Sequence, residues 1–224
     1  LAFVQLTDGQ ARYVFVDEGS AGRMLSEDDL PPIPANVKAM HFGSISLTVE
    51  PCGSTYETLM QNESPLRVIS LDPNIRPTQI KNRDGYMGRI GRMVAMSDIV
   101  KFSDDDLAWM APDGNFDAFA ADWLESGAKL VIMTRGAEGA VARTRAVNAS
   151  IPGVAITVAD TIGAGDTFSA GVLARLDRQQ LLSKDAIADL NARQLEDALG
   201  FAARAAAVTA SRPGANPPWH EELE

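Results

Sequence analysis

The nine residues DTIGAGDTF, Asp160 to Phe168, constrain the fold of this chain more than any other segment. They follow a short apolar run, Val154 to Val158, of the kind that favours a β-strand. After them, apolar residues recur at helical spacing, at Phe168, Val172 and Leu176. The segment is therefore predicted to lie at a turn between a strand and a helix.

Two glycines make this turn a candidate anion site. Gly163 and Gly165 permit positive φ and a close approach of the backbone to a ligand, so successive N–H groups can converge on an anion at the helix N-terminus. Asp166 follows directly, and an aspartate at such a position ordinarily caps the helix.

The alternative interpretation of Asp166 is catalytic. If the anion is a phosphoryl group in transfer, the amides of Gly163, Ala164, Gly165 and Asp166 would form the anion hole that stabilises its charge. The Asp166 carboxylate would take a proton from the attacking hydroxyl. This is the arrangement of a small-molecule kinase.

Composition excludes several classes of partner. The formal net charge is −10 with no cluster of lysine and arginine, so neither nucleic acid nor an anionic membrane is an expected partner. Cys52 is the only cysteine, which excludes an intramolecular disulfide and favours a cytoplasmic setting. No apolar run reaches the roughly 18 residues of a transmembrane helix. His41 is expected to be packed and hydrogen-bonded rather than a metal ligand.

Short apolar runs alternate with amphipathic stretches, which favours the α/β class with a parallel sheet covered by helices. The predicted strands are Ala39 to Phe42, Leu66 to Leu71, Asp98 to Phe102, Leu130 to Met133, Ala140 to Arg143 and Val154 to Val158. The predicted helices are Ser54 to Gln61, Gln79 to Ala95, Asp104 to Met110 and Phe116 to Ser126, and a later one whose apolar face contains Leu195, Leu199, Ala202 and Ala206.

The first thirty residues differ from this pattern. Ala2 to Leu6 and Arg12 to Val16 are separated by the polar turn Thr7 to Gln10, which predicts a β-hairpin. From these residues alone, an ordinary edge hairpin and a functional lid are both open.

Further segments match one family in the right order. DTIGAGDTF continues with SAG at Ser169 to Gly171 and resembles the C-terminal signature of the ribokinase-like (PfkB) carbohydrate kinases. DPNIR at Asp72 to Arg76 resembles that family's segment after a central strand, and VKFSDDDL at Val100 to Leu107 its lysine-polar-acidic segment. VIMTRGAEGA at Val131 to Ala140 resembles its nucleotide-side strand and turn. The tail TASRPGANPPW, Thr209 to Trp219, looks most like that of bacterial fructokinases.

The resemblance begins in the middle of the family's pattern. Members start with a strand, a GGxxxN-type segment and a GxxG segment that supply most sugar contacts, and none of these occurs here. We therefore expect the chain to be part of a longer protein, and the activity of the isolated chain stays open. The resemblance implies that residues 1–30, with EGSA at Glu18 to Ala21, belong to a small β lid that closes over the sugar and contributes to a homodimer. Residues 31–224 would form most of a three-layer α/β/α kinase domain with a mostly parallel sheet.

The activity implied by the resemblance is in-line transfer of the ATP γ-phosphoryl group to a sugar hydroxyl, with Asp166 as general base and fructose as the best guess. The nearest alternatives are 2-keto-3-deoxygluconate kinase and ribokinase. A non-catalytic sugar- or nucleotide-sensing relative is the alternative of another class, and the intact Asp166 with both glycines argues against it. There is no GxxxxGK[ST] motif, so Mg²⁺ and backbone amides must neutralise the phosphates.

The resemblance also implies individual contacts. Those with ATP are expected at Lys101, Ser103, Thr134, Gly136, Gly139, Gly214, Ala215 and Asn216, a plain tight turn being the alternative for Thr134 and Gly136. Those with the sugar are expected at Asp166, Ser44, Asn74 and Arg76. An activating K⁺ is expected among mainly backbone oxygens around Asp160, Ile162, Thr209, Arg212 and Gly214.

One motif departs from the family's pattern. Where members have an NxxE-type motif that helps to position the metal and the phosphates, this chain has Ser103 and Asp106. We expect Asp106 to act on Mg²⁺ indirectly, with Asp104 or Asp105 as competitors for that role. A solvated acidic helix start is the alternative, because acidic residues favour first turns.

Overall fold

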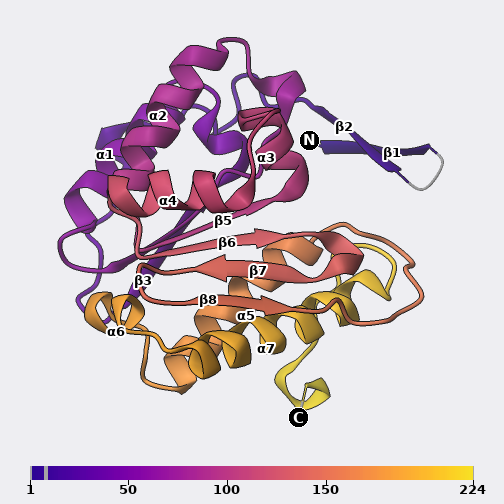
Figure 1. Ribbon diagram of the computed structural model, residues 1–224. Coiled ribbons are helices and arrows are strands. Elements are labelled where there is room, and N and C mark those ends of the chain that lie inside the picture. Colours follow the sequence, from indigo (N-terminus) through magenta and orange to yellow (C-terminus); the bar gives the residue numbers. More distant parts are fainter. Residues whose placement is uncertain (1, 8–9, 224) are drawn as a thin grey trace.

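The computed structural model describes residues 2–7 and 10–223, with side chains from Val16 onward. Six strands form the central sheet: β3 (Ala39–Gly43), β4 (Val68–Asp72), β5 (Ile99–Ser103), β6 (Leu130–Thr134), β7 (Ala140–Arg143) and β8 (Asn148–Ile151). They lie side by side in chain order (Figure 1). β3 to β6 pair in parallel, whereas β7 and β8 extend the sheet through antiparallel pairs. The parallel strands β4 to β6 are buried almost throughout, as expected for strands covered on both faces.

Helices cover both faces, so the molecule has three layers (Figure 1). One face carries α1 (Cys52–Glu63), α2 (Arg83–Ala95), α3 (Asp104–Met110) and α4 (Phe116–Ser126). The other carries α5 (Ala164–Arg178), α6 (Lys184–Ala188) and α7 (Ala192–Ala210). Short 3₁₀ turns lie in the connections, at Glu27–Asp29, Ser44–Leu47, Pro77–Gln79, Gly136–Glu138 and His220–Glu222. The predicted α/β class and the three-layer arrangement are confirmed.

Two apolar clusters, one on each side of the sheet, hold the layers together. On the α4 side, the fully buried Phe102 of β5 meets Phe119 and Trp123 edge-on, with ring centroids 5.5 and 5.2 Å away. On the other side α5 and α7 pack so closely that a Cβ at Gly171 would lie 2.8 Å from the Cα of Ala202. This close packing fixes the position of α5. The start of this helix contains Gly163 to Asp166, which we call the GAGD turn.

Several boundaries follow from local signals. The predictions for α3, α4 and β7 agree with the structure to the residue. Asn115 caps α4, since its side chain accepts a hydrogen bond from the Ala118 amide. The helix predicted from Gln79 is wrong at its start, because Pro77–Gln79 form a 3₁₀ turn and Asn82 caps α2 from Arg83. The predicted apolar face of the last helix is confirmed in α7, where Leu195 and Leu199 are fully buried.

The strand predicted at Val154 to Val158 is wrong. The structure assigns no strand to these described residues, and the side chains of Val154, Ile156 and Val158 are 40%, 38% and 59% exposed. The sheet instead ends with β8, whose short sequence NASI buries only every second side chain and therefore contains no apolar run. The segment DTIGAGDTF thus runs from a loop into the start of α5, and no strand precedes it directly.

The predicted N-terminal hairpin is confirmed as β1 (Ala2–Thr7) and β2 (Gln10–Phe15), an antiparallel pair that projects from the body (Figure 1). The predicted polar turn includes residues 8 and 9, which lie outside the described residues. The role of the hairpin as a lid stays a prediction. In the part of the chain that the structure describes, no helix combines the length and the apolar character needed to cross a membrane.

Candidate active site

The carboxyl ends of the parallel strands bring the predicted site residues to one edge of the sheet. Gly43 at the end of β3 pairs with Asp72 at the end of β4, and Ser103 of β5 pairs with Thr134 of β6. Open α/β sheets bind their ligands at this edge. The segments that follow these strands are therefore the first place to look for a site.

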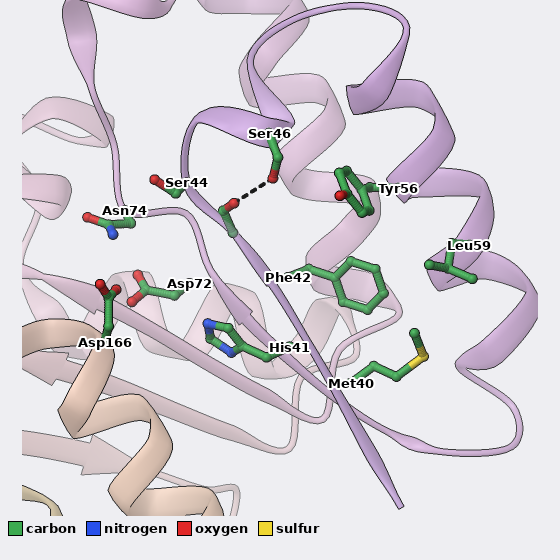
Figure 2. A pocket seen from close by; sticks show the side chains of 11 residues that line it. Met40, His41, Phe42, Ser44, Ser46, Tyr56, Leu59, Asp72, Asn74 and Asp166 are labelled. Atoms are coloured by element: carbon green, nitrogen blue, oxygen red, sulfur yellow. Dashed lines mark hydrogen bonds between the residues drawn. The ribbon is translucent and has the colours of Figure 1, made fainter. Parts of the chain in front are cut away.

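A cavity of about 330 Å³ opens beside β3 and β4, the β3–β4 cavity (Figure 2). It is lined by the polar side chains of Ser44, Ser46, Asp72, Asn74 and Asp166, by Met40, Phe42, Tyr56 and Leu59, and by His41 and Gly43. Three of the four predicted sugar contacts, Ser44, Asn74 and Asp166, thus share one cavity. Arg76 is not among the lining residues, and its guanidinium donates to the backbone oxygen of Ile75 at 3.0 Å.

Two lining residues hold unusual backbone conformations. Ser44 and Asn74 have φ values of 64° and 43°, and among the described non-glycine residues only Gln180 also has a positive φ. Such conformations cost about 1–3 kcal/mol each and cluster at functional sites. Nearby, a Cβ at Gly43 would lie 2.1 Å from the backbone oxygen of Asp72, so this position requires glycine. The backbone strain supports a functional role for this cavity.

Eight of the lining residues were not predicted as ligand contacts, and three of them carry a titratable side chain: His41, Tyr56 and Asp72. His41 is hydrogen-bonded as expected, since its Nδ1 lies 3.0 Å from the Ser70 hydroxyl, but it is exposed rather than packed. Partial removal from water lowers the pKa of the His41 imidazole, while the Asp72 and Asp166 carboxylates oppose this effect. The signal for Asp72 is an acid at the end of a strand that is otherwise almost entirely apolar. Tyr56 carries no such signal, because only the packing of α1 brings it to the cavity.

Asp166 lies in the first turn of α5 and is not its N-cap. The N-cap is Gly163, in the left-handed conformation with φ 77°, and no described side chain caps this end of the helix. The capping interpretation of Asp166 is therefore wrong, and its exposed side chain lines the β3–β4 cavity instead. First-turn amides have no partner within their own helix, so this uncapped end can bind an anion.

Gly165 leaves space for a neighbouring side chain and does not serve through its φ. It lies within α5 and does not have a positive φ, whereas Gly163 does. A Cβ at Gly165 would lie 3.2 Å from the Nζ of Lys101, which is tighter than an ordinary contact. The expectation that both glycines permit positive φ therefore holds at Gly163 alone.

A second cavity, of about 560 Å³, lies between β6 and α5, and we call it the β6–α5 cavity. Its lining includes Thr134, Gly136 and Gly139, three of the predicted ATP contacts, together with Ala164 and Gly165 of the GAGD turn. The exposed apolar loop of residues 153–158 forms another wall. An apolar wall beside an anion site suits a heterocyclic base joined to phosphates.

The other predicted ATP contacts lie outside the lining of the β6–α5 cavity. Lys101 is buried and bonded to Asp72 at 2.9 Å. Ser103 caps α3. Gly214, Ala215 and Asn216 lie behind the GAGD turn, where a Cβ at Gly163 would be 3.1 Å from that of Ala215. Lys101 and Ala215 therefore lie against the turn, whereas Ser103 belongs to the start of α3.

The loops predicted to hold K⁺ are joined by one carboxylate. Asp160 accepts hydrogen bonds from the amides of Ile162 at 2.9 Å and Gly214 at 3.0 Å. The Thr209 hydroxyl donates to that of Thr167 at 2.9 Å, and Arg212 pairs with Glu222. In the described chain, no three histidine, cysteine, aspartate or glutamate side chains form a group that could hold a metal ion. A cation at this place would depend on backbone oxygens.

Asp106 is buried and already satisfied by backbone amides, contrary to a solvated helix start. One carboxylate oxygen accepts from the Ser103 amide at 2.9 Å and the other from the Ile75 amide at 2.8 Å. Only 5% of its surface is exposed, whereas Asp104 and Asp105 are exposed. Asp106 therefore ties the start of α3 to the DPNIR segment that carries Asn74.

Comparison with known proteins agrees with these features. Residues 1–222 match the pfkB family carbohydrate kinase model. The chain is 53% identical over 197 residues to a fructokinase from Rhizobium leguminosarum bv. trifolii, covering 88% of this chain and 60% of that protein. It therefore spans less than two thirds of this relative's length.

Two solved structures share the fold. Fructokinase from Vibrio cholerae O395, in a form with bound fructose, ADP and calcium ion, has a TM-score of 0.76 and 26% identity, over 91% of this chain and 64% of that one. Aminoimidazole riboside kinase from Salmonella enterica, complexed with aminoimidazole riboside and an ATP analog, has a TM-score of 0.79 and 26% identity, over 94% and 68%. With its family model matched along almost the whole length, this chain belongs to the pfkB family of carbohydrate kinases.

Proposed function

We propose that this chain contains the catalytic base and the nucleotide site of an ATP-dependent sugar kinase whose acceptor is fructose. One observation carries the proposal: the GAGD turn separates two cavities. Asp166 lines the β3–β4 cavity, while Ala164 and Gly165 line the β6–α5 cavity. In-line phosphoryl transfer needs a base on the side of the acceptor and hydrogen-bond donors around the phosphoryl group. The 53% identity to a Rhizobium fructokinase supports fructose as the acceptor.

In the proposed reaction, an acceptor hydroxyl in the β3–β4 cavity attacks the γ-phosphorus of ATP. As the new O–P bond forms, the bond from the γ-phosphorus to the bridging oxygen breaks, ADP leaves, and the hydroxyl proton passes to Asp166. The first-turn amides of α5 stabilise the transferred group, at about 3 kcal/mol for each good donor by analogy with oxyanion holes. No covalent enzyme intermediate is needed.

Mg²⁺ fits this site as a companion of the phosphates rather than as a protein-held ion. Mg²⁺ keeps several waters and often binds through one or two carboxylates plus substrate phosphates. Both oxygens of Asp106 already accept backbone hydrogen bonds and the side chain is buried, which favours an indirect role. Asp104 and Asp105 are exposed near the same edge and could hold a bound water. When bound, the ion would neutralise charge on the phosphates.

The substrate test is ADP release by the purified full-length protein with Mg-ATP and fructose, ribose, 2-keto-3-deoxygluconate or adenosine. Turnover that depends on fructose supports the proposal. Turnover with another acceptor alone keeps the kinase and replaces fructose. The absence of turnover with all four acceptors would contradict the proposed function.

K⁺ activation is proposed for the loops joined by Asp160. Replacing NaCl by KCl at equal ionic strength is expected to raise the initial rate severalfold, because an ion bound by these loops would order the GAGD turn. The measurement is the rate of ADP release in the two salts, with choline chloride as the reference. Equal rates in NaCl and KCl would remove K⁺ from the mechanism.

The hairpin of β1 and β2 is proposed to close over the acceptor and to pair with a second copy of the chain. Its projection from the body supports this role (Figure 1). Deleting residues 1–16 is expected to convert a dimer to a monomer, as measured by sedimentation equilibrium. A dimer that persists after the deletion would contradict the dimer contact.

A further inference from the structure

A buried ion pair lies directly beneath the GAGD turn. The Nζ of Lys101 on β5 lies 2.9 Å from an oxygen of Asp72 on β4, and the two side chains are 7% and 3% exposed. The same Nζ would lie 3.2 Å from a Cβ at Gly165. The missing side chain at Gly165 therefore lets the ammonium reach the first turn of α5.

The position of Lys101, buried beneath a helix N-terminus, is unfavourable for the stability of the fold. A helix N-terminus carries about half a positive charge, so acidic residues stabilise it and cations do not. The chain follows this rule at α3, whose first turn holds three aspartates. Burying an ammonium costs several kcal/mol before any partner repays it. Where local rules of stability are broken, a functional reason is expected.

Asp72 holds the ammonium against this unfavourable field. Its Oδ2 accepts from Lys101 at 2.9 Å and from the Ser169 hydroxyl of α5 at 3.4 Å. Its Oδ1 is buried and has no hydrogen-bond partner among the described residues. Burial raises the pKa of Asp72, and the ammonium of Lys101 opposes that rise. The pair thus joins β4, β5 and α5 at one point under the anion site.

We propose that Lys101 is a positioning residue whose buried ammonium, fixed by Asp72, adds positive potential beneath the N-terminus of α5 and strengthens the hold on a phosphoryl group in transfer. In this role Lys101 does not touch the phosphoryl group. Its ammonium lies behind Gly165 and acts through the turn. The inference rests on the proposed kinase function for its main test.

The main test is Lys101→Met, which removes the charge and keeps most of the length of the side chain. We expect kcat for sugar phosphorylation to fall about tenfold to a hundredfold, since the lost potential acts mostly in the transition state. We expect KM for the sugar to stay within about twofold of wild type. The matched control is Lys184→Met, because Lys184 pairs at 2.6 Å with the buried Asp98, which precedes β5 and lies away from the site. This control should keep the kcat of wild type.

The double variant Asp72→Asn/Lys101→Met distinguishes a purely structural role of the pair from the proposed electrostatic role of Lys101. It removes the uncompensated buried carboxylate, so its stability in urea should recover relative to Lys101→Met. Two comparisons test the lysine. Lys101→Met is compared with wild type, and the double variant is compared with Asp72→Asn. A lower kcat in both comparisons supports the inference. Equal kcat in either folded pair would overturn it.

Failure of the kinase function would be visible separately, as a wild-type protein without turnover. The inference is then tested by calorimetric titration with inorganic phosphate. Weaker binding by Lys101→Met than by wild type and by Lys184→Met supports it. Equal affinities, or binding by none of these proteins, would overturn it.

Discussion

Asp166→Asn is expected to lower kcat by about a hundredfold to ten thousandfold, the range that a positioned general base contributes. The side chain lines the β3–β4 cavity from the first turn of α5, where the acceptor hydroxyl would lie. Asparagine has nearly the same shape but cannot take up the proton. ATP affinity should stay unchanged, because the β6–α5 cavity is lined by Ala164 and Gly165 and not by Asp166.

The measurements are steady-state kinetics with fructose and calorimetric binding of ATP. Asp177→Asn is the matched control: it lies on the same helix, and its ion pair with Lys38 is exposed. Exposed ion pairs contribute about 0–1 kcal/mol, so this variant should behave as wild type. If Asp166→Asn kept most of the turnover, Asp166 would not be the base.

Asp106→Ala is expected to lower the free energy of unfolding by about 3 kcal/mol, from the lost helix cap and the lost buried hydrogen bond to a charged acceptor. Alanine leaves the amides of Ser103 and Ile75 without their acceptor at the edge of the sheet. The DPNIR segment should then move, and with it Asn74 in the β3–β4 cavity. Urea unfolding followed by fluorescence measures the stability, and KM for the sugar should rise.

The control for this prediction is Asp104→Ala, in the same first turn but exposed. Most substitutions at such surface positions change stability by less than about 0.5 kcal/mol. Equal losses in the two variants would contradict the anchoring role of Asp106. A change in Mg²⁺ dependence at Asp106 without loss of stability would instead favour a role on the metal.

Local sequence signals predicted much of the fold correctly. α3, α4 and β7 were predicted to the residue, because a capping side chain or a glycine turn marks their ends. The strand predicted at Val154 to Val158 failed because an apolar run looks the same whether it enters a sheet or lines an open cavity. Only the position of its neighbours in space decides between the two.

The motif residues could also be predicted, since DTIGAGDTF, DPNIR and the tail carry the resemblance to the family. The structure brings Ser44, Asn74 and Asp166 to one cavity and Thr134, Gly136 and Gly139 to another. These contacts depend on strand ends that meet at one edge of a parallel sheet, which the α/β pattern already implies. The separation of the two cavities by the GAGD turn was not visible in the sequence.

The sequence by itself determined the class of the fold, the family and the segments that approach the ligands, because these depend on periodicity and on motifs with short spacing. The tertiary structure alone decided what the charged groups do. Lys101 meets Asp72 across 29 residues, and Asp106 meets Ile75 across 31. Burial removes water as a competitor for these charges, and burial follows from the packing of helices against both faces of the sheet rather than from any local pattern.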